Sequence, residues 1–339
     1  MQVLYIGGTG EISFSCIEES VRLGHEVWVY NRGNRNAGLP AECRFLEGDV
    51  HDDTAYGAAA RRGFDVVCQF RLFEPAEIRR DVEIFDGRCG QYVFISTASA
   101  YRKPVRGLPL TEDVPLHNPY WAYSTAKAQM ESILAAQERI PWTVVRPSHT
   151  YRTRMPAWLD WNVDASRMLR GKPVVLPGDG ESLWTLTHAE DFARPFARLL
   201  GSDAALGEAF HITSDRAWSW NEIVEAVAGA LGVAEPEVVH VPSDTLVRYE
   251  PAWTGPLLGD KSWSTLFDNS KVRSVVGAFD CPIDPWRGMA MVAERFPPDP
   301  SAFDPVADAL LDRVAAEQSA LGGGPGATSP FGMNAPGAS

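Results

Sequence analysis

Short apolar runs alternate with amphipathic stretches through the first half of the chain. Residues 3–6, Val-Leu-Tyr-Ile, have the composition of a buried strand and lead into a stretch with helical spacing of its apolar positions. Three further runs, at residues 26–30, 44–50 and 64–70, predict more strands. Strands that alternate with helices in this way predict an α/β fold with a doubly wound parallel sheet.

A glycine-rich turn, Gly7-Gly-Thr-Gly-Glu-Ile-Ser13, joins the first predicted strand to the first predicted helix. Gly7 permits a tight turn, Gly10 lets the backbone approach a pyrophosphate, and the start of the helix supplies oriented N–H groups. Ser13 replaces the third glycine of the usual dinucleotide pattern. Glu11 would repel a phosphate unless its carboxylate turned toward the substrate or the cofactor ribose. The predicted cofactor-binding residues of the turn are Gly7, Thr9, Gly10, Glu11 and Ile12.

The loop after the second predicted strand bears on the choice between NAD and NADP. An Asp or Glu there would bind the free 2′-hydroxyl of NAD, but the chain has Asn31 and Arg32, and an arginine can pair with the 2′-phosphate of NADP. Arg32, with Arg35 as a second cation, therefore favours NADP over NAD; the alternative is that both are solvated loop charges. Asp49 and Val50, at the end of the third predicted strand, are expected at the adenine.

Tyr123 and Lys127 have the spacing that places two side chains on one face of a helix. A tyrosine with a pKa of about 10 is a poor base, and a neighbouring ammonium lowers that pKa by favouring the phenolate. The pair is therefore a candidate acid/base for taking or giving an alcohol proton during hydride transfer. An alanine-rich helix also carries Tyr and Lys at this interval by chance, so the rest of the chain has to decide.

The second half of the chain offers candidate substrate contacts. Arg152 and Arg154 would bring two cations to the mouth of a cleft to bind a phosphate or carboxylate, unless they pair with surface acids instead. Trp161 and Asn162 offer an aromatic face and amide donors for a sugar or base, although tryptophans also serve as packing anchors. Residues 246–263, rich in Pro, Gly and Trp, predict a loop over the cleft. Its candidate contacts are Tyr249, Trp253 and Lys261.

Composition narrows the function classes. The chain has 339 residues and a formal net charge of −13, which argues against nucleic-acid binding because affinity for phosphates rests on basic surface. Its five cysteines and seven histidines are scattered without ligand or disulfide spacing, so we expect reduced thiols and no metal site. No stretch of about 20 apolar residues occurs and the chain begins directly with a strand, which predicts no membrane span, no signal peptide and a cytoplasmic location.

The sequence resembles the short-chain dehydrogenase/reductase superfamily, and most closely its extended or atypical branch, the NAD-dependent epimerase/dehydratase family. Besides the glycine-rich turn and the Tyr-Lys pair, the matching segments follow in order at residues 48–49, 94–101, 145–151, 178–180, 187–193 and 267–271. Ordered agreement of this kind is more specific than any single motif. The resemblance implies a Rossmann-type doubly wound parallel sheet followed by a smaller C-terminal α/β substrate lobe.

The resemblance also implies a catalytic triad of Thr97, Tyr123 and Lys127. Tyr123 would act as acid/base, Lys127 would bind the nicotinamide ribose and lower the tyrosine pKa, and Thr97 would hold the substrate oxygen, with Ser96 and Ser99 as rival hydroxyls. The other implied contacts are Ser96, Pro147 and Ser148 for the cofactor and Ser99 and His149 for the substrate. His149 replaces an asparagine of many relatives and is a candidate second proton carrier; the alternative is a structurally satisfied loop histidine.

The domain organisation follows from the same resemblance. We expect a Rossmann core and a substrate lobe that interleave along the chain, the core over residues 1–155, 181–215 and 262–280 and the lobe over residues 156–180 and 216–321. The Gly/Pro-rich tail, residues 322–339, has a linker's composition, and we expect it to pack on the enzyme or on a partner subunit. The family implies a homodimer formed through the helix that holds Tyr123.

We therefore predict an NAD(P)-dependent epimerase or dehydratase that acts on the sugar of a nucleotide sugar or nucleoside. It would work by transient oxidation of a hydroxyl and retain its cofactor through turnover. Dehydratases of this family follow the threonine with Asp-Glu, whereas this chain has Ala98-Ser99, so the usual acid and base for dehydration are missing, although Glu11, His149 or an acid from the C-terminal region could substitute. One alternative is an NADPH-dependent ketoreductase with net redox turnover. Another is a non-catalytic binding protein, since some chloroplast relatives bind RNA stem-loops on this fold.

Overall fold

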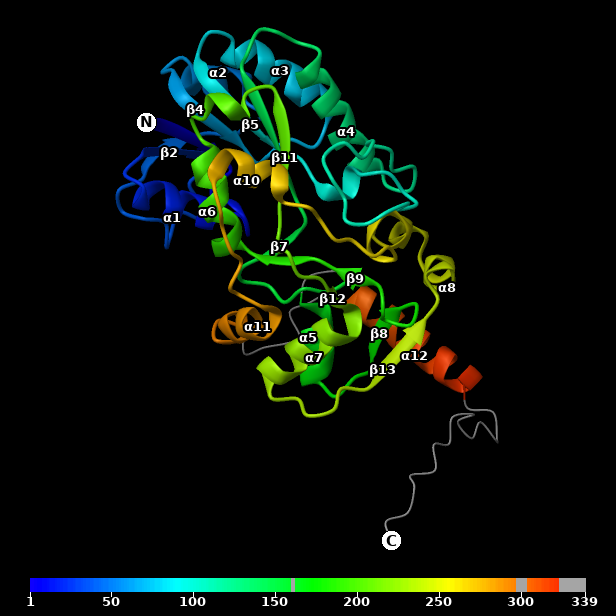
Figure 1. The fold of residues 1–339 in the computed structure, drawn as a ribbon. Helices are drawn as coiled ribbons and strands as arrows, with labels where there is room; N and C mark the ends of the chain where they lie inside the picture. The colour runs from blue at the N-terminus through cyan, green and yellow to red at the C-terminus, as the bar shows by residue number, and fades with distance from the viewer. Residues whose placement is uncertain (160–161, 297–303, 323–339) are drawn as a thin grey trace.

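The apolar runs of the first half form strands of one sheet in which all neighbours are parallel. The computed structural model describes residues 1–159, 162–296 and 304–322, and the sheet forms the upper lobe in Figure 1. Its seven strands lie in the order β11-β6-β5-β4-β1-β2-β3. They are β1 (Gln2–Ile6), β2 (Glu26–Asn31), β3 (Arg44–Glu47), β4 (Phe64–Gln69), β5 (Cys89–Ile95), β6 (Trp142–Pro147) and β11 (Glu208–Ile212). The predicted Rossmann-type doubly wound fold is therefore confirmed.

Helices cover both faces of this sheet because both faces are apolar. One face packs against α1 (Ser13–Arg22), α6 (Ala189–Leu199) and α10 (Ser270–Val276). The other face packs against α2 (Asp53–Ala60), α3 (Pro75–Phe85) and α4 (Ala122–Ala135). Alternate residues of β1 enter the two cores, Val3 and Tyr5 on one side and Leu4 and Ile6 on the other, as expected for a strand buried on both faces.

The second half of the chain builds the lower lobe around a third core (Figure 1). Its helices are α5 (Val163–Leu169), α7 (Trp220–Leu231), α11 (Pro285–Ala293) and α12 (Pro305–Gly322). They pack with a two-stranded parallel sheet of β8 (Val174–Pro177) and β13 (Val238–Val241). Residues 183–188, which we expected within the Rossmann core, form β9 (Leu183–Trp184) and β10 (Leu186–His188), which pair with β12 (Trp218–Ser219) and β7 (His149–Tyr151).

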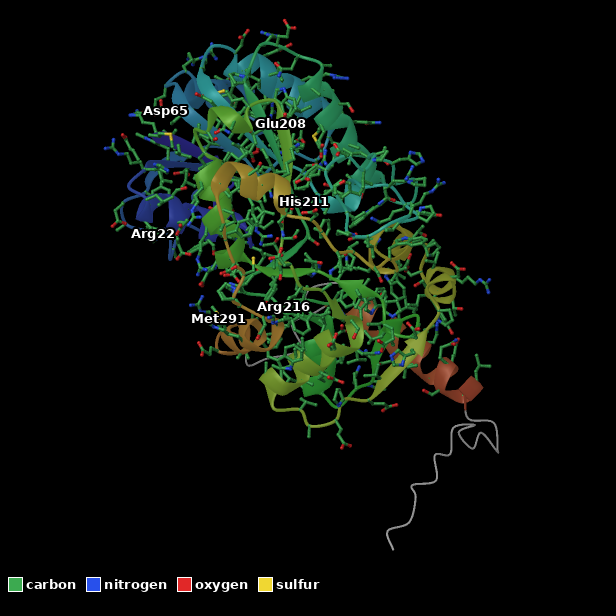
Figure 2. All side chains as sticks on the ribbon, viewed as in Figure 1. Arg22, Asp65, Glu208, His211, Arg216 and Met291 are labelled. Carbon is green, nitrogen blue, oxygen red and sulfur yellow. The ribbon has the colours of Figure 1, made fainter. Side chains whose placement is uncertain are left out.

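The chain does re-enter the upper lobe at α6, β11 and α10. Figure 2 shows Glu208 and His211 on the upper lobe and Arg216 on the lower one, so β11 leads the chain directly between them. Residues 246–263, predicted as a loop, instead form a series of short helical turns. The helical segments of the described residues not yet named are η1 (Ala98–Ala100), η2 (Asp203–Ala205), α8 (Ser243–Tyr249), η3 (Pro251–Trp253), α9 (Thr254–Pro256) and η4 (Leu257–Lys261). The predicted tail, apart from Gly322 at the end of α12, lies outside the described residues.

Candidate active site

A cavity of about 730 Å³ opens at the carboxyl ends of β1, β5 and β6, where ligands bind in open parallel sheets. Its walls come from the glycine-rich turn, the segments after β5 and β6, the start of α4, and η4. A second cavity of about 420 Å³ continues toward the end of β2. The two cavities share the lining residues Gly7, Thr9, Arg35 and Arg71, and together they form a channel along the edge of the sheet.

The glycine-rich turn has the geometry of a dinucleotide cradle. Gly7 has a φ of +101°, which L residues rarely adopt, and a Cβ there would lie 2.4 Å from the side chain of Arg71. The first helix begins at Ser13, and its N-cap residue Ile12 offers no side-chain cap; such a helix end accommodates a phosphate well. The residues present therefore fit a pyridine dinucleotide.

The second cavity is where the adenosine end of such a ligand would lie. The predicted residues that line it are Asn31, Arg32, Arg35, Asp49 and Val50. The side chain of Asn31 also serves the loop itself, because its Oδ1 accepts from the N–H of Gly33 at 2.8 Å. A hydrogen bond from the N–H of His51 lowers the pKa of Asp49, and the nearby guanidinium of Arg32 lowers it further. The cavity thus presents cations beside a carboxylate that stays ionised.

One wall of the first cavity carries the predicted triad of Thr97, Tyr123 and Lys127. The hydroxyl of Thr97 accepts from the N–H of Ser99 at 3.2 Å and lies 3.0 Å from the Ser99 hydroxyl. Burial raises the pKa of Tyr123 to about 12, a hydrogen bond with Thr97 lowers it, and the carboxylate of Asp260 raises it. Tyr123 is therefore a phenol at neutral pH.

Lys127 lies beside Tyr123 but directs its ammonium elsewhere. Its Nζ donates to the carbonyl oxygens of Leu72 at 2.8 Å and Ile95 at 2.9 Å, and lies 5.8 Å from the centroid of the Tyr123 ring. Two carbonyls thus hold the ammonium, and the Tyr123 pKa is raised overall with burial as the largest cause; that Lys127 lowers this pKa stays a prediction.

A buried ion pair lies one helical turn after Lys127. Burial lowers the pKa of Lys127 to about 7, while the carboxylates of Glu131 and then Glu77 raise it. Arg146 binds Glu131 through Nη2 at 2.7 Å and through Nε at 3.1 Å. Ser96 donates its hydroxyl to the same carboxylate. Ser96, predicted to contact the cofactor, thus lines the cavity but commits its hydroxyl to Glu131.

The remaining walls bring aromatic and charged side chains to the same cavity. Besides the predicted Pro147 and Ser148, they contribute Trp121, His149, Trp184, Asp260 and Lys261. His149 packs edge-on against Trp184 with ring centroids 6.2 Å apart. Burial holds the pKa of His149 well below its usual range, and the charge of Lys261 lowers it further. A neutral imidazole can polarise a substrate, but His149 does not start as a proton donor.

Glu11 lines the cavity, yet the protein itself binds its carboxylate. The carboxylate accepts from the N–H groups of Arg152 at 2.9 Å and Thr153 at 2.7 Å, and from the Thr153 hydroxyl at 2.5 Å. Arg154, predicted to bind an anionic group, is half exposed and lies 3.9 Å from the same carboxylate. Glu11 therefore ties the glycine-rich turn to the segment after β7, in place of the predicted contact with ribose or substrate.

Other predicted substrate contacts also point away from the site. Among the described residues that line the two cavities, neither Arg152 nor Asn162 appears. The guanidinium of Arg152 lies 3.7 Å from the centroid of the Phe14 ring on α1. Asn162 has a φ of 72°, and its Oδ1 accepts from the N–H of Met155 at 2.6 Å, so it closes a turn. Trp161 lies outside the described residues.

Sequence reasoning missed part of the site. Among the lining residues that it did not assign to the site are Trp121, Trp184 and Asp260. Of its three candidates in the segment over the cleft, only Lys261 lines the cavity. Trp253 packs edge-on against Trp158 at 5.4 Å in the lower lobe, and Tyr249 donates to Glu317 at 2.6 Å on α12. Asp260 and Lys261, adjacent charged residues in the Gly- and Trp-rich segment 246–263, were the sequence signal for this part of the site. Only tertiary packing decides which side chains of that segment face the cavity.

The sequence profile described as "NAD dependent epimerase/dehydratase family" matches residues 3–213. The chain belongs to this family. The chloroplast stem-loop binding protein of 41 kDa b of Arabidopsis thaliana is 28% identical over 257 residues, 70% of this chain and 65% of that protein, so the chain spans just under two thirds of that relative. The 2′-dehydrokanamycin reductase of Streptomyces kanamyceticus is 28% identical over 248 residues, 68% of this chain and 67% of that protein.

Solved structures of the family share the fold. The UDP-glucose 4-epimerase of Thermus thermophilus, solved with NAD, has a TM-score of 0.69 and 22% identity, over 87% of this chain and 98% of that one. The dependence of the family on NAD agrees with the fit of the glycine cradle to a pyridine dinucleotide. In the part of the chain that the structure describes, no cluster of His, Cys, Asp and Glu could hold a metal ion. None of the described helices is both long and apolar enough to cross a membrane.

Proposed function

We propose that the protein transforms a sugar by transient oxidation of a hydroxyl, as an epimerase or dehydratase of a nucleotide sugar or nucleoside does. The observation that carries this proposal is the convergence of Thr97, Tyr123 and Lys127 on one cavity with the glycine cradle. A pyridine nucleotide in that cradle supplies the hydride acceptor and donor. The presence of a UDP-glucose 4-epimerase among the structures of the same fold supports a sugar substrate.

Tyr123 moves the proton in this proposal. As a phenol with a pKa of about 12, it can donate to a ketone oxygen when the sugar is reduced. Taking the proton of a hydroxyl requires the phenolate, and the ammonium of Lys127 would stabilise that form by turning from its two carbonyls toward the ring. Thr97 would hold the substrate oxygen, since it lines the same cavity as Tyr123 and lies close enough to lower the Tyr123 pKa.

Epimerisation fits this site better than dehydration. Expelling water needs a second acid and base beside the tyrosine. Where dehydratases of the family have an Asp-Glu pair, this chain has Ala98 and Ser99. The hydroxyl of Ser99 lies 3.0 Å from the Thr97 hydroxyl and 2.7 Å from the Ser124 hydroxyl. A serine tied into this chain of hydroxyls is no substitute for a carboxylate, whereas epimerisation requires only Tyr123 and the hydride carrier.

A net ketoreductase is the second candidate. The protonated state of Tyr123 suits ketone reduction without any rearrangement of Lys127. Arg32 and Arg35 line the cavity at the adenosine end, which favours the 2′-phosphate of NADP. The similarity to 2′-dehydrokanamycin reductase also supports this candidate.

Cofactor retention separates the two candidates. We would denature the purified protein and identify any released nicotinamide by mass spectrometry and absorbance. Near-stoichiometric oxidised cofactor supports the self-regenerating cycle of an epimerase, whereas a protein that exchanges NADPH freely supports the reductase. In either case a Tyr123→Phe variant should lose at least about 100-fold in turnover while still binding cofactor. Full activity of that variant would overturn both candidates.

A further inference from the structure

The end of the cavity formed by η4 carries a lysine that the proposed proton transfer does not use, beside the Asp260 carboxylate that raises the Tyr123 pKa. η4 is a single turn of π-helix, a conformation that is rare and occurs often at functional sites. Its last two residues, Asp260 and Lys261, are 8% and 7% exposed, and both line the cavity. A buried ion pair at this place is costly to maintain for stability alone, because desolvation opposes the attraction between its members.

The ammonium of Lys261 lies between two tryptophans. Its Nζ is 5.6 Å from the ring centroid of Trp121 and 5.5 Å from that of Trp184. Asp260 accepts one of its three N–H groups at 3.2 Å. Among the described residues no other acceptor lies within hydrogen-bond distance of this Nζ. The ammonium therefore retains donors in a gap between two aromatic faces.

The charges around Asp260 do not balance. Lys103, 2% exposed, lies near enough to the pair for both of its members to act on it, and its Nζ reaches the carbonyl oxygen of Tyr101 at 3.5 Å. Burial lowers the pKa of Lys103, the carboxylate of Asp260 raises it, and the charge of Lys261 lowers it. Asp260 is therefore the carboxylate that both lysines share. His149, on the cavity wall, contributes no negative charge. A chain with a net charge of −13 thus places two buried lysines near one buried carboxylate at this end of the cavity, and one of the two, Lys261, lines it.

We propose that Lys261 binds an anionic group of the substrate, a carboxylate or a phosphate, which enters between Trp121 and Trp184. The anion would occupy the remaining donors of Lys261 and balance the second buried cation, while the aromatic faces pack against the adjoining sugar ring. This inference rests on the proposed function only in taking the ligand to be the substrate. It also makes a polycationic sugar such as an aminoglycoside a poor ligand, because Lys261 and Lys103 would repel it.

The test compares sugars that differ in charge, with the cofactor present. D-glucuronate, D-glucose 6-phosphate and D-glucose are titrated into the full chain, and their affinities are measured by ligand-observed NMR. At least one of the two anions should bind about tenfold more tightly than glucose, the difference expected of one charge-assisted hydrogen bond. The stronger of the two anions identifies the group as a carboxylate or a phosphate. Equal binding of all three sugars, or no binding of any, overturns the proposal.

Variants assign the preference to Lys261. Lys261→Met keeps an unbranched chain between the tryptophans and should abolish the preference for anions, whereas Lys261→Arg should keep it. Asp260→Asn removes the competing carboxylate and should tighten anion binding, an effect that loss of folding cannot produce. Lys271→Met is the matched control, since Lys271 pairs with Glu208 at 2.8 Å outside the cavity. Anion preference that survives in Lys261→Met overturns the assignment.

Binding does not depend on turnover, so this proposal and the proposed function can fail separately. If Tyr123→Phe remains fully active while anion binding depends on Lys261, the redox mechanism is wrong and the anion site stands. If Tyr123→Phe is inactive and the three sugars bind alike, the redox mechanism stands and the anion site is wrong.

Discussion

The buried carboxylate of Glu131 should control the protonation of Lys127. The proposed chemistry needs Lys127 as an ammonium, yet burial lowers its pKa to about 7. The charged groups that act on it are Glu131, one turn along α4, and Glu77 from α3. Glu131 accepts paired hydrogen bonds from Arg146, from Nε at 3.1 Å and from Nη2 at 2.7 Å. We therefore predict that Glu131→Gln, which removes the charge and keeps an oxygen for Arg146, lowers the pKa of Lys127.

The size of the effect follows from the helix geometry. Side chains four residues apart on a helix are neighbours, with Cβ atoms about 6 Å apart. At a charge separation of about 6 Å and an effective dielectric constant of about 20, a carboxylate and an ammonium attract by about 3 kcal/mol, which corresponds to about two pKa units. The guanidinium of Arg146 cancels part of this field. We therefore expect a drop of at least about one unit, from about 7 to about 6 or lower.

The assay is a pH titration of lysine side-chain NMR signals, with Lys127→Arg used to assign the resonance. The matched control is Glu77→Gln, which should shift the pKa less because Glu77 is the weaker of the two influences. In activity measurements the alkaline limb of the pH profile should move to lower pH in Glu131→Gln by the same amount. An unchanged Lys127 pKa in a folded Glu131→Gln protein would refute the reasoning and leave Glu131 a purely structural partner of Arg146.

Three further predictions concern stability and cofactor choice. The free energy of unfolding of the unaltered protein, compared with that of Lys127→Met, should rise as the pH rises from about 7 to about 10. In that window Lys127 has released its proton in the folded protein but still binds it in the unfolded chain. Denaturant titrations at several pH values measure this slope. Glu11→Ala should lower the free energy of unfolding by about 2 kcal/mol, because it leaves the backbone N–H groups of Arg152 and Thr153 without their acceptor. Cofactor affinity should change little. A large loss of cofactor affinity without destabilisation would contradict the structural role of Glu11. Arg32→Ala should weaken NADPH binding by about tenfold and leave NADH binding unchanged, as isothermal titration calorimetry would show; an equal loss for both cofactors would mean that Arg32 does not read the 2′-phosphate.

Much of the upper lobe follows from local sequence signals. The apolar run before Gly7 forms β1, and the amphipathic stretch from Ser13 forms α1, because both elements are set by short-range periodicity and by the conformational freedom of glycine. Tyr123 and Lys127 share a helix and a cavity for the same reason: helical spacing alone fixes their side of α4.

Only the tertiary structure decided how the second half of the chain meets this frame. Glu11 was expected to face a ligand, but it receives hydrogen bonds from Arg152 and Thr153, which lie far along the chain and approach it only after folding. Arg152 stacks on Phe14 instead of entering the cleft. The direction of a loop side chain depends on which distant surfaces pack against it, and no short-range pattern encodes that choice.

The same reason explains the pKa values and the charged end of the cavity. The sequence by itself determined that a tyrosine and a lysine would be neighbours, whereas burial decided that the phenol stays protonated and that two carbonyls hold the ammonium. Asp260 and Lys261 became part of the site because η4 of one lobe packs over the carboxyl edge of the sheet in the other. Desolvation and charge proximity are properties of the assembled interior, so they appear only when both lobes are in place.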